Sequence, residues 1–270
     1  INRLAVLAEG DQITLLVNNN AIAQVTDDSF AAGSVGLAAG TFDEDQLAVA
    51  FDNFDLWVLG ESEAATPAPA LATLDSAAIA GQIAAIRQTE PMFADDFRRN
   101  TGIWLDPEDN DATFAFAAGA YRVTVDAPHI IPGSTGDITV DNFLLEVDAA
   151  QRSGPGGQYG LSFRRVDDAN FYLYAITPTG LYSFGKMVEG EWRELITWTE
   201  SDAILQGEGE VNRLGVLADG AIFTLLVNDQ PVAQFEDGSF ASGQIALTAG
   251  AFDETGVEVE FDNLAIWTLE

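Results

Sequence analysis

The sequence predicts an all-β protein, a two-sheet sandwich of the jelly-roll kind that is repeated along the chain. Two observations lead to this fold class. Residues 1–60 align without a gap on residues 211–270, with about half of the positions identical, so one segment occurs twice. From residue 93 onward, short apolar and aromatic runs are separated by turn sequences that carry Gly, Pro, Asp or Asn. Many short strands with little helix are typical of a sandwich.

The repeated segment has the pattern of strands that are buried on one face. Its second run alternates, and one face is apolar in both copies, at positions Ile13, Leu15, Val17 and Phe223, Leu225, Val227. Asp219-Gly220, between two such runs, indicates a tight hairpin. In the last run the alternation slips by one residue at Asp262-Asn263, and this slip predicts a β-bulge.

The repeat also predicts how the chain is divided. Residues 91–270 form a complete sandwich, residues 61–90 form a linker, and residues 1–60 form the C-terminal half of a preceding sandwich. A half-sandwich alone leaves a core face and strand edges uncovered. We therefore expect this half to be completed within a longer tandem protein or by another subunit, and the behaviour of repeat arrays favours the tandem protein.

The linker is extended and rich in Ala and Pro, and it ends in a short helix. Asp75 or Ser76 can cap this helix, and Pro91 stops it. Three apolar residues recur at helical spacing, namely Ile79, Ile83 and Ile86. We expect a helix over about residues 76–89 that acts as a spacer packed on the sandwich; the alternative role is a docking surface between successive domains.

Composition restricts the partners. The chain carries 43 Asp and Glu against 11 Lys and Arg, a net charge of −32, and the field of such a protein repels nucleic acid and anionic lipid. It has no Cys, and its apolar runs are too short to span a membrane. An acidic surface suits a saline or calcium-containing exterior, so we expect an extracellular or cell-surface protein without membrane insertion.

A family resemblance is carried by motifs that follow in order: DDF and a following G-W pair, FLLEVDA, YGLSFRRVDDANFY, GEWRELITWT, NRLGVLADG and VEFDNLAIW. Together they resemble a concanavalin A-like, laminin-G-like sandwich domain, of the sort that is repeated in large bacterial surface and secreted proteins. The similarity covers residues 93–270 and, through the repeat, residues 1–59. It implies the fold, whereas the fold itself hosts lectin-like modules, glycoside hydrolases and structural spacers.

The resemblance raises glycoside hydrolysis, which requires two carboxylates beside the scissile bond. Family 16 glycoside hydrolases carry Glu-x-Asp-x-Glu along one strand, whereas this chain has Glu146, Asp148 and then Ala150. The position of the acid/base residue is therefore empty, and we expect a protein that is not an enzyme. The sole histidine, His129, has no catalytic motif around it and is expected to be structural.

Aromatic residues suggest carbohydrate binding instead. The alternation in residues 170–176 directs Phe171 and Leu173 to the core and Tyr172 and Tyr174 outward, where an aromatic pair can stack on a sugar ring. Further candidate binding residues are Trp104, Tyr159 and Arg164. The competing interpretation is that these aromatic residues only cover part of the sheet or contact a neighbouring domain.

A structural calcium site is the one cofactor that the sequence suggests. Carboxylates are ligands for Ca²⁺, and the first and last strands of a sandwich can lie side by side. The candidate ligands near the two ends of the domain are Asp95, Asp96, Asp253, Glu254 and Asp262. The competing interpretation is that they are solvated acids in turns.

The sequence therefore favours a non-catalytic, extracellular tandem-repeat protein with a structural, adhesive or filament-forming role. Its expected partners are neighbouring repeats or subunits of the same protein. The alternative is an array of carbohydrate-binding modules that take up polysaccharide through outward-facing aromatic residues.

Overall fold

The computed structural model describes residues 4–9, 12–18, 20–26, 35–37, 49, 51, 75–104, 111–154 and 156–269. The chain divides into two compact units, Ile1–Ala65 and Thr66–Glu270. Within the described residues, no helix has the length and apolar character needed to cross a membrane.

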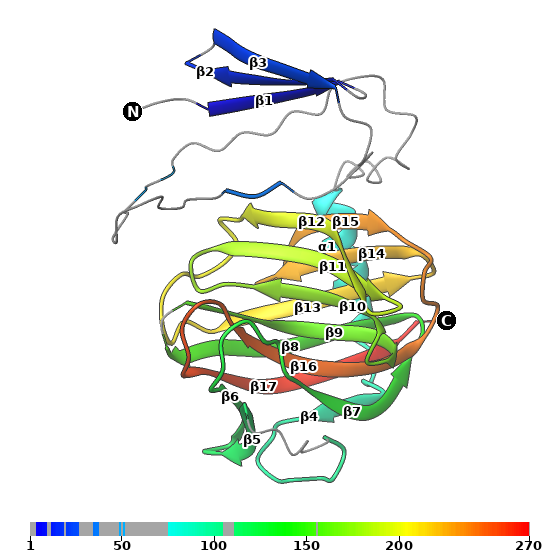
Figure 1. Cartoon of the computed structure of the whole chain (residues 1–270). Coiled ribbons are helices and arrows are strands. Elements are labelled where there is room, and N and C mark those ends of the chain that lie inside the picture. Colours follow the sequence, from blue (N-terminus) through cyan, green and yellow to red (C-terminus); the bar gives the residue numbers. More distant parts are fainter. Residues whose placement is uncertain are drawn as a thin grey trace. The chain divides into compact units, whose positions relative to one another are not determined.

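The second unit is a sandwich of two antiparallel sheets that face one another (Figure 1). The six-stranded sheet has the order β12 (Glu191–Glu200), β11 (Leu181–Val188), β10 (Asn170–Ile176), β9 (Gly157–Asp167), β16 (Gly243–Ala251), β7 (Gly133–Val140). The eight-stranded sheet has the order β15 (Gln230–Glu236), β14 (Ile222–Val227), β13 (Asn212–Asp219), β8 (Phe143–Ser153), β17 (Val257–Thr268), β6 (Ala120–Val125), β5 (Ala112–Ala117), with β4 (Phe93–Asp95) also paired to β17.

Aromatic side chains from both sheets form the centre of the core. Phe163 stacks on Tyr172 and Phe184, with ring centroids 5.5 and 6.0 Å apart, and Phe223 reaches this group from the other sheet. All four rings are fully buried. Close-packed aromatic pairs of this kind stabilise a core beyond the burial of their apolar area.

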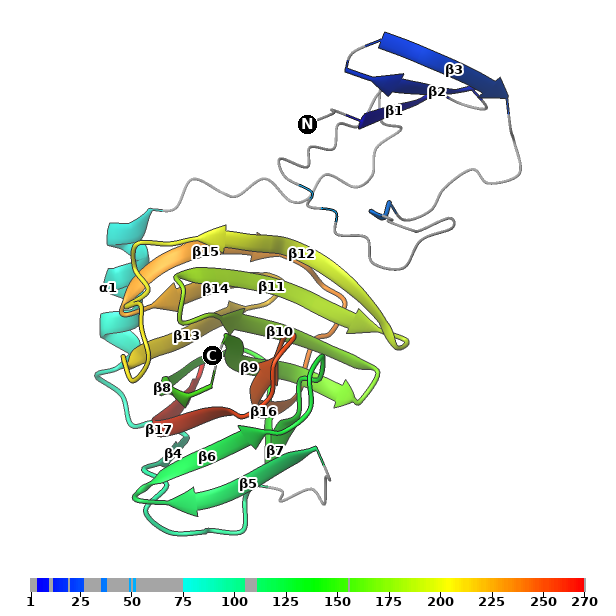
Figure 2. The ribbon, with the colours of Figure 1, turned by 60° about the vertical axis from the view of Figure 1, so that its left-hand side comes forward.

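Helix α1 (Ser76–Ile86) packs on the outer face of the eight-stranded sheet (Figure 2). Asp75 caps it by accepting a hydrogen bond from the backbone N–H of Ala78 at 3.0 Å. Its buried residues Ile79 and Ile83 contact an apolar patch made of Leu144, Leu217, Leu226 and Trp267. The helix ends three residues before the predicted limit, and Thr89 in the following turn accepts a hydrogen bond from the Trp267 indole.

The first unit contains a three-stranded antiparallel sheet of β1 (Leu4–Glu9), β2 (Gln12–Val17) and β3 (Asn20–Thr26). It repeats β13, β14 and β15 strand for strand. Leu4 pairs with Val17 as Leu214 pairs with Val227, and both sheets have a register shift at the same position of the second pairing. Even the hydrogen bond from Gln24 to Thr14 recurs, between Gln234 and Thr224, at 3.1 Å in each. The repeat in the sequence is thus a repeat in structure over these strands.

The predicted bulge at Asp262-Asn263 is confirmed. The pairing of β17 with β8 shifts between Asp262 and Ala265, and Asn263 adopts a φ of 52°. The Asn263 side chain donates a hydrogen bond to the Asp148 carboxylate at 3.0 Å. The bulged residue Asn263 of β17 is therefore tied by its side chain to β8, in the middle of the eight-stranded sheet. The matching residues 52 and 53 lie outside the described part of the chain.

A buried ionic cluster joins the two sheets at one end. Asp237, just after β15, accepts hydrogen bonds from the Lys186 ammonium and the Tyr172 hydroxyl. Burial acts to raise the pKa of Asp237, but its hydrogen bonds with Lys186, Tyr172 and Ser239 outweigh burial and lower the pKa below the ordinary value. The ionised carboxylate therefore stabilises the folded state.

We expect Asp237→Asn to lower the free energy of unfolding by about 3 kcal/mol at pH 7, because it leaves Lys186 buried and unpaired. Because folding lowers the pKa of Asp237, its carboxylate stabilises the folded state fully at pH values above the pKa that Asp237 has in the unfolded chain. This stabilisation is lost as the pH falls through the lower pKa of the folded state. The difference between the two proteins should therefore narrow below about pH 4. Urea unfolding at pH 7 and pH 3 measures it, and an equal difference at both pH values would contradict the assignment.

Candidate functional site

The acids of the hydrolase-like motif are bound by arginines. Glu146 and Asp148 lie on β8, in the eight-stranded sheet, and both face away from the core. Arg87 binds Glu146 through Nε at 3.1 Å and Nη2 at 2.7 Å. Arg213 binds Asp148 through Nε at 2.8 Å and Nη2 at 3.1 Å. The hydrogen bond to Asp148 raises the pKa of Arg213, as expected for a paired guanidinium.

These two ion pairs have a structural function. The pair of Arg87 with Glu146 fastens the segment after α1 to the sheet, and the pair of Arg213 with Asp148 lies across the pairing of β8 with β13. His129 is exposed, with its Nε2 3.8 Å from Asp253 Oδ1. Both carboxylates of the motif are thus engaged by guanidinium groups.

The predicted orientation of Tyr172 and Tyr174 is wrong. Both side chains are fully buried and point into the core, whereas Leu173 and Ala175 lie on the outer face. The alternation was assigned in the wrong phase, because both faces of β10 carry apolar residues. The hydroxyl of Tyr174 donates to the Leu226 carbonyl at 3.1 Å, so this ring is a core residue with a satisfied polar end.

The other three predicted sugar-binding residues are also buried. Trp104 donates from its indole to Asp95 at 3.1 Å, and Tyr159 accepts from Asn212 at 3.3 Å. The Arg164 guanidinium donates to the backbone carbonyls of Asp141 and Phe240. Each polar end is thus used within the sandwich, and these side chains cannot stack on a sugar in solution.

The five predicted calcium ligands do not converge. β4 does pair with β17, which brings Asp95 and Asp96 beside Asn263 in a shared hollow. Asp253 and Glu254 lie in the exposed loop before β17, well away from this pairing. Asp95 itself accepts hydrogen bonds from the Phe97 backbone and the Trp104 indole. Among the described residues, no group of three or more His, Cys, Asp or Glu could hold a metal ion.

The outer face of the six-stranded sheet carries a line of large side chains across five strands. The strand register places Trp192 opposite Met187, Met187 opposite Phe171, and Arg165 opposite Gln244. The Arg165 guanidinium lies over the Phe171 ring, 4.8 Å from its centroid, and pairs with Asp168. We call these five residues, Trp192, Met187, Phe171, Arg165 and Gln244, the Trp192 row.

Trp192 packs against the backbone of the neighbouring strand at Gly185. A Cβ added to Gly185 would lie 2.3 Å from the Trp192 ring, so the indole occupies the space that any other residue at position 185 would fill. The Trp192 side chain nevertheless remains 45% exposed. The Trp192 indole therefore packs on Gly185, and much of its surface is open to solvent.

Beside the Trp192 row lie mostly small residues, which are buried. The next positions in register are Gly185, Leu173, Ser162 and Ala246. The Ser162 hydroxyl is buried and has no hydrogen-bond partner among the residues that the structure describes. At the far end of this face, Trp198 from β12 meets Phe252 after β16, with ring centroids 6.0 Å apart. Large aromatic residues thus border a floor of small side chains.

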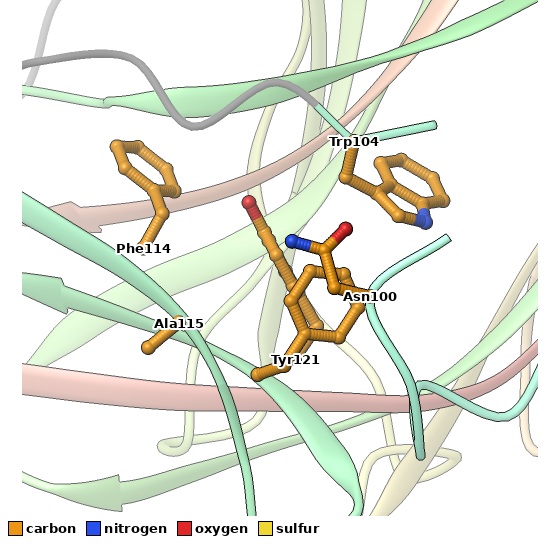
Figure 3. A pocket seen from close by; sticks show the side chains of 6 residues that line it. Asn100, Trp104, Phe114, Ala115 and Tyr121 are labelled. Carbon is orange, nitrogen blue, oxygen red and sulfur yellow. The ribbon is translucent and has the colours of Figure 1, made fainter. Parts of the chain in front are cut away.

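Besides the hollow beside Asp95, Asp96 and Asn263, another hollow lies near β5 and β6, at the β5 edge of the eight-stranded sheet. It has a volume of about 270 Å³, and Figure 3 shows Asn100 among the aromatic side chains of Phe114, Trp104 and Tyr121. The Asn100 carboxamide oxygen already accepts from the Gly102 backbone at 2.8 Å, and Trp104 and Tyr121 are buried. The hollow therefore offers fewer exposed groups to a ligand than the Trp192 row.

Solved structures share this architecture at low sequence identity. A β-glucanase of Bacillus licheniformis matches with a TM-score of 0.51 and 13% identity over 67% of this chain and 100% of its own. A Bacillus subtilis protein of unknown function with a galectin-like fold matches at 0.52 and 10%, over 67% of this chain and 96% of its own. A β-1,3-1,4-glucanase (lichenase) from a mouse hindgut metagenome matches at 0.50 and 16%, over 66% and 99%.

The sandwich is a concanavalin A-like jelly roll. At these identities the likeness to solved structures shows the fold of the jelly roll alone. No family model matches the chain. In one curated protein, the TPR repeat-containing protein of Treponema pallidum (strain Nichols), 113 residues match at 33% identity. They make up 42% of this chain and span only 13% of that protein.

The sequence indicated Trp192 only as one of several aromatic residues that can offer a flat face to a sugar, and it did not reveal the Trp192 row. Trp192 was visible in the sequence as an aromatic residue beside charged ones, in Glu191-Trp192-Arg193. Its seat, Gly185, lies on the preceding strand, and only the register of β11 with β12 brings the two together. A glycine in one strand of a hairpin together with a tryptophan in the other strand is a sequence signal that could have indicated this packing.

Proposed function

We propose that the jelly roll is a non-catalytic module that binds polysaccharide along the outer face of the six-stranded sheet. The observation that carries this proposal is the indole of Trp192, which is seated on Gly185 and is 45% exposed. A flat, positioned aromatic ring loses little conformational entropy when an apolar sugar face stacks on it.

Polar groups along the same row suit the hydroxyls of a sugar chain. Arg165 and Gln244 lie at its other end, and Glu194 lies two residues from Trp192 on the same strand. The residues beside the row are mostly small, and Gly185, Ser162 and Ala246 project no large side chain over it. Two of the similar solved structures are glucanases, which supports a glucan as the first ligand class to test. A secreted or cell-surface location belongs to the same proposal.

We expect Trp192→Ala to weaken binding to its polysaccharide by about tenfold or more, because the central stacking surface is removed. Isothermal titration against lichenan, laminarin and related glucans measures the change. Ile222→Ala is the matched control, because Ile222 is 46% exposed but lies on β14 of the other sheet, and this change should leave the affinity unaltered. Equal binding by Trp192→Ala and the unchanged protein would contradict the proposed face.

A second candidate function is a structural role in a tandem array. The specific observation that favours it is the exposure of apolar residues in the first unit, including Leu4, Val6 and Ile22. Native material that is short, uniform in mass and free of higher-order assembly would exclude a filament. The two functions are compatible, because an array of modules can both bind polysaccharide and join its neighbours.

A further inference from the structure

The sheet of β1, β2 and β3 carries the apolar side chains of a sandwich core, but these side chains are exposed to solvent. Leu4, Val6 and Leu15 are 69%, 67% and 38% exposed, whereas their counterparts Leu214, Val216 and Leu225 are each 0% exposed. The pairing register is the same in both sheets, so the difference does not come from the strands themselves. Among the residues that the structure describes, the first sheet therefore lacks the cover that its copy has.

The copy shows what that cover is. Strand β8 pairs with the free edge of β13, from Asn212 opposite Ala149 to Ala218 opposite Phe143. The inner face of the copy is covered by the aromatic residues of the six-stranded sheet, which contact Phe223. Its outer face is covered by α1 through Leu217 and Leu226. All three covering elements come from residues 75–210.

We propose that β1 is a docking edge for a strand of the β8 type, carried by a segment homologous to residues 75–210 that lies outside these 270 residues. The chain holds two copies of the 60-residue repeat and one of residues 75–210. That one copy is already paired with β13. A second molecule of these 270 residues holds the same ratio of the two segments, which favours a further segment over a second copy as the occupant.

The sequence of the first sheet also constrains the occupant. Arg3 aligns with Arg213, which pairs with Asp148 on β8, so the docking strand should carry an acid at the position of Asp148. Ile13 and Val25 replace Phe223 and Phe235, which fill the aromatic core of the complete sandwich. The occupant should therefore place larger side chains opposite these two positions, because the combined volume must still fill the core.

The test compares the 270-residue chain with an extended chain in which a copy of residues 75–210 directly precedes Ile1. This junction reproduces the natural step from Glu210 to Val211. Hydrogen exchange followed by mass spectrometry should show that the amides of residues 4–17 exchange about 100-fold more slowly in the extended chain. The amides of residues 212–227 serve as the internal reference and should not change.

Substitutions make the result specific. In the extended chain, Val6→Asp should abolish the protection because its counterpart Val216 is fully buried, whereas Gln12→Asp should not, since its counterpart Ile222 is exposed. Ile13→Phe combined with Val25→Phe should increase the protection by restoring the aromatic core. Equal exchange of residues 4–17 in both chains would overturn the proposal. Slow exchange in the 270-residue chain together with a dimeric mass would show that a second copy is the occupant instead.

Discussion

Arg164→Met is expected to lower the free energy of unfolding of the jelly roll by about 4 kcal/mol. The side chain is 1% exposed, and its guanidinium donates three hydrogen bonds, two to the Asp141 carbonyl at 3.0 and 2.7 Å and one to the Phe240 carbonyl at 3.0 Å. It also lies 4.9 Å from the centroid of the Phe223 ring. Methionine fills most of the volume but leaves both carbonyls without these donors.

Urea unfolding followed by tryptophan fluorescence measures this change. Arg98→Met is the matched control, because the Arg98 side chain is 77% exposed and forms a 3.6 Å ion pair with Asp96. Its effect should stay within about 0.5 kcal/mol. Equal effects of the two substitutions would show that Arg164 does not tie these loops to the core.

Gly160→Ala is expected to lower the free energy of unfolding by about 3 kcal/mol. A Cβ at Gly160 would lie 1.9 Å from the Tyr174 carbonyl oxygen and 2.7 Å from the Ala175 Cα, so β9 and β10 would have to move apart. Backbone atoms in the middle of a paired sheet cannot turn aside as a flexible side chain can. The same unfolding experiment detects the loss.

The identical change in the helix should have the opposite sign. Gly81 lies in α1, and a Cβ there would have no atom within 4 Å. Gly81→Ala should therefore raise the helix propensity and stabilise the jelly roll by about 0.5–1 kcal/mol. If both substitutions destabilised the protein equally, the close approach of β10 to Gly160 would not be the cause of the first effect.

Local features of the fold were predictable from the sequence where one face of a strand is apolar and the other is not. The strands of the repeat, the hairpin at Asp219-Gly220 and the bulge at Asp262-Asn263 all depend on neighbouring residues. The helix followed from the spacing of its isoleucines and the cap at Asp75. Each of these features depends on residues that lie within about a dozen positions of one another in the sequence.

The candidate site was not predictable, because it depends on register between strands. In β10 both faces carry apolar side chains, so the period of two gives no phase, and Tyr172 and Tyr174 were assigned to the wrong face. The arginines that bind Glu146 and Asp148 are far from them in the sequence, at positions 87 and 213. Likewise, Trp192 is a platform only because Gly185 lies beneath it.

The duplicated three-stranded sheets also have a consequence for how the chain folds. β8 pairs with the edge of β13, and β1 has the same register with β2 as β13 has with β14, so β1 offers the collapsing chain a second edge of the same kind. Pairing with β1 would trap a misassembled intermediate, the characteristic error of tandem repeats with similar sequences. Phe223 and Phe235 select the correct partner, because Ile13 and Val25 would leave the aromatic core underfilled. Sequence divergence between the two copies therefore favours the pairing of β8 with β13 over its pairing with β1 during folding.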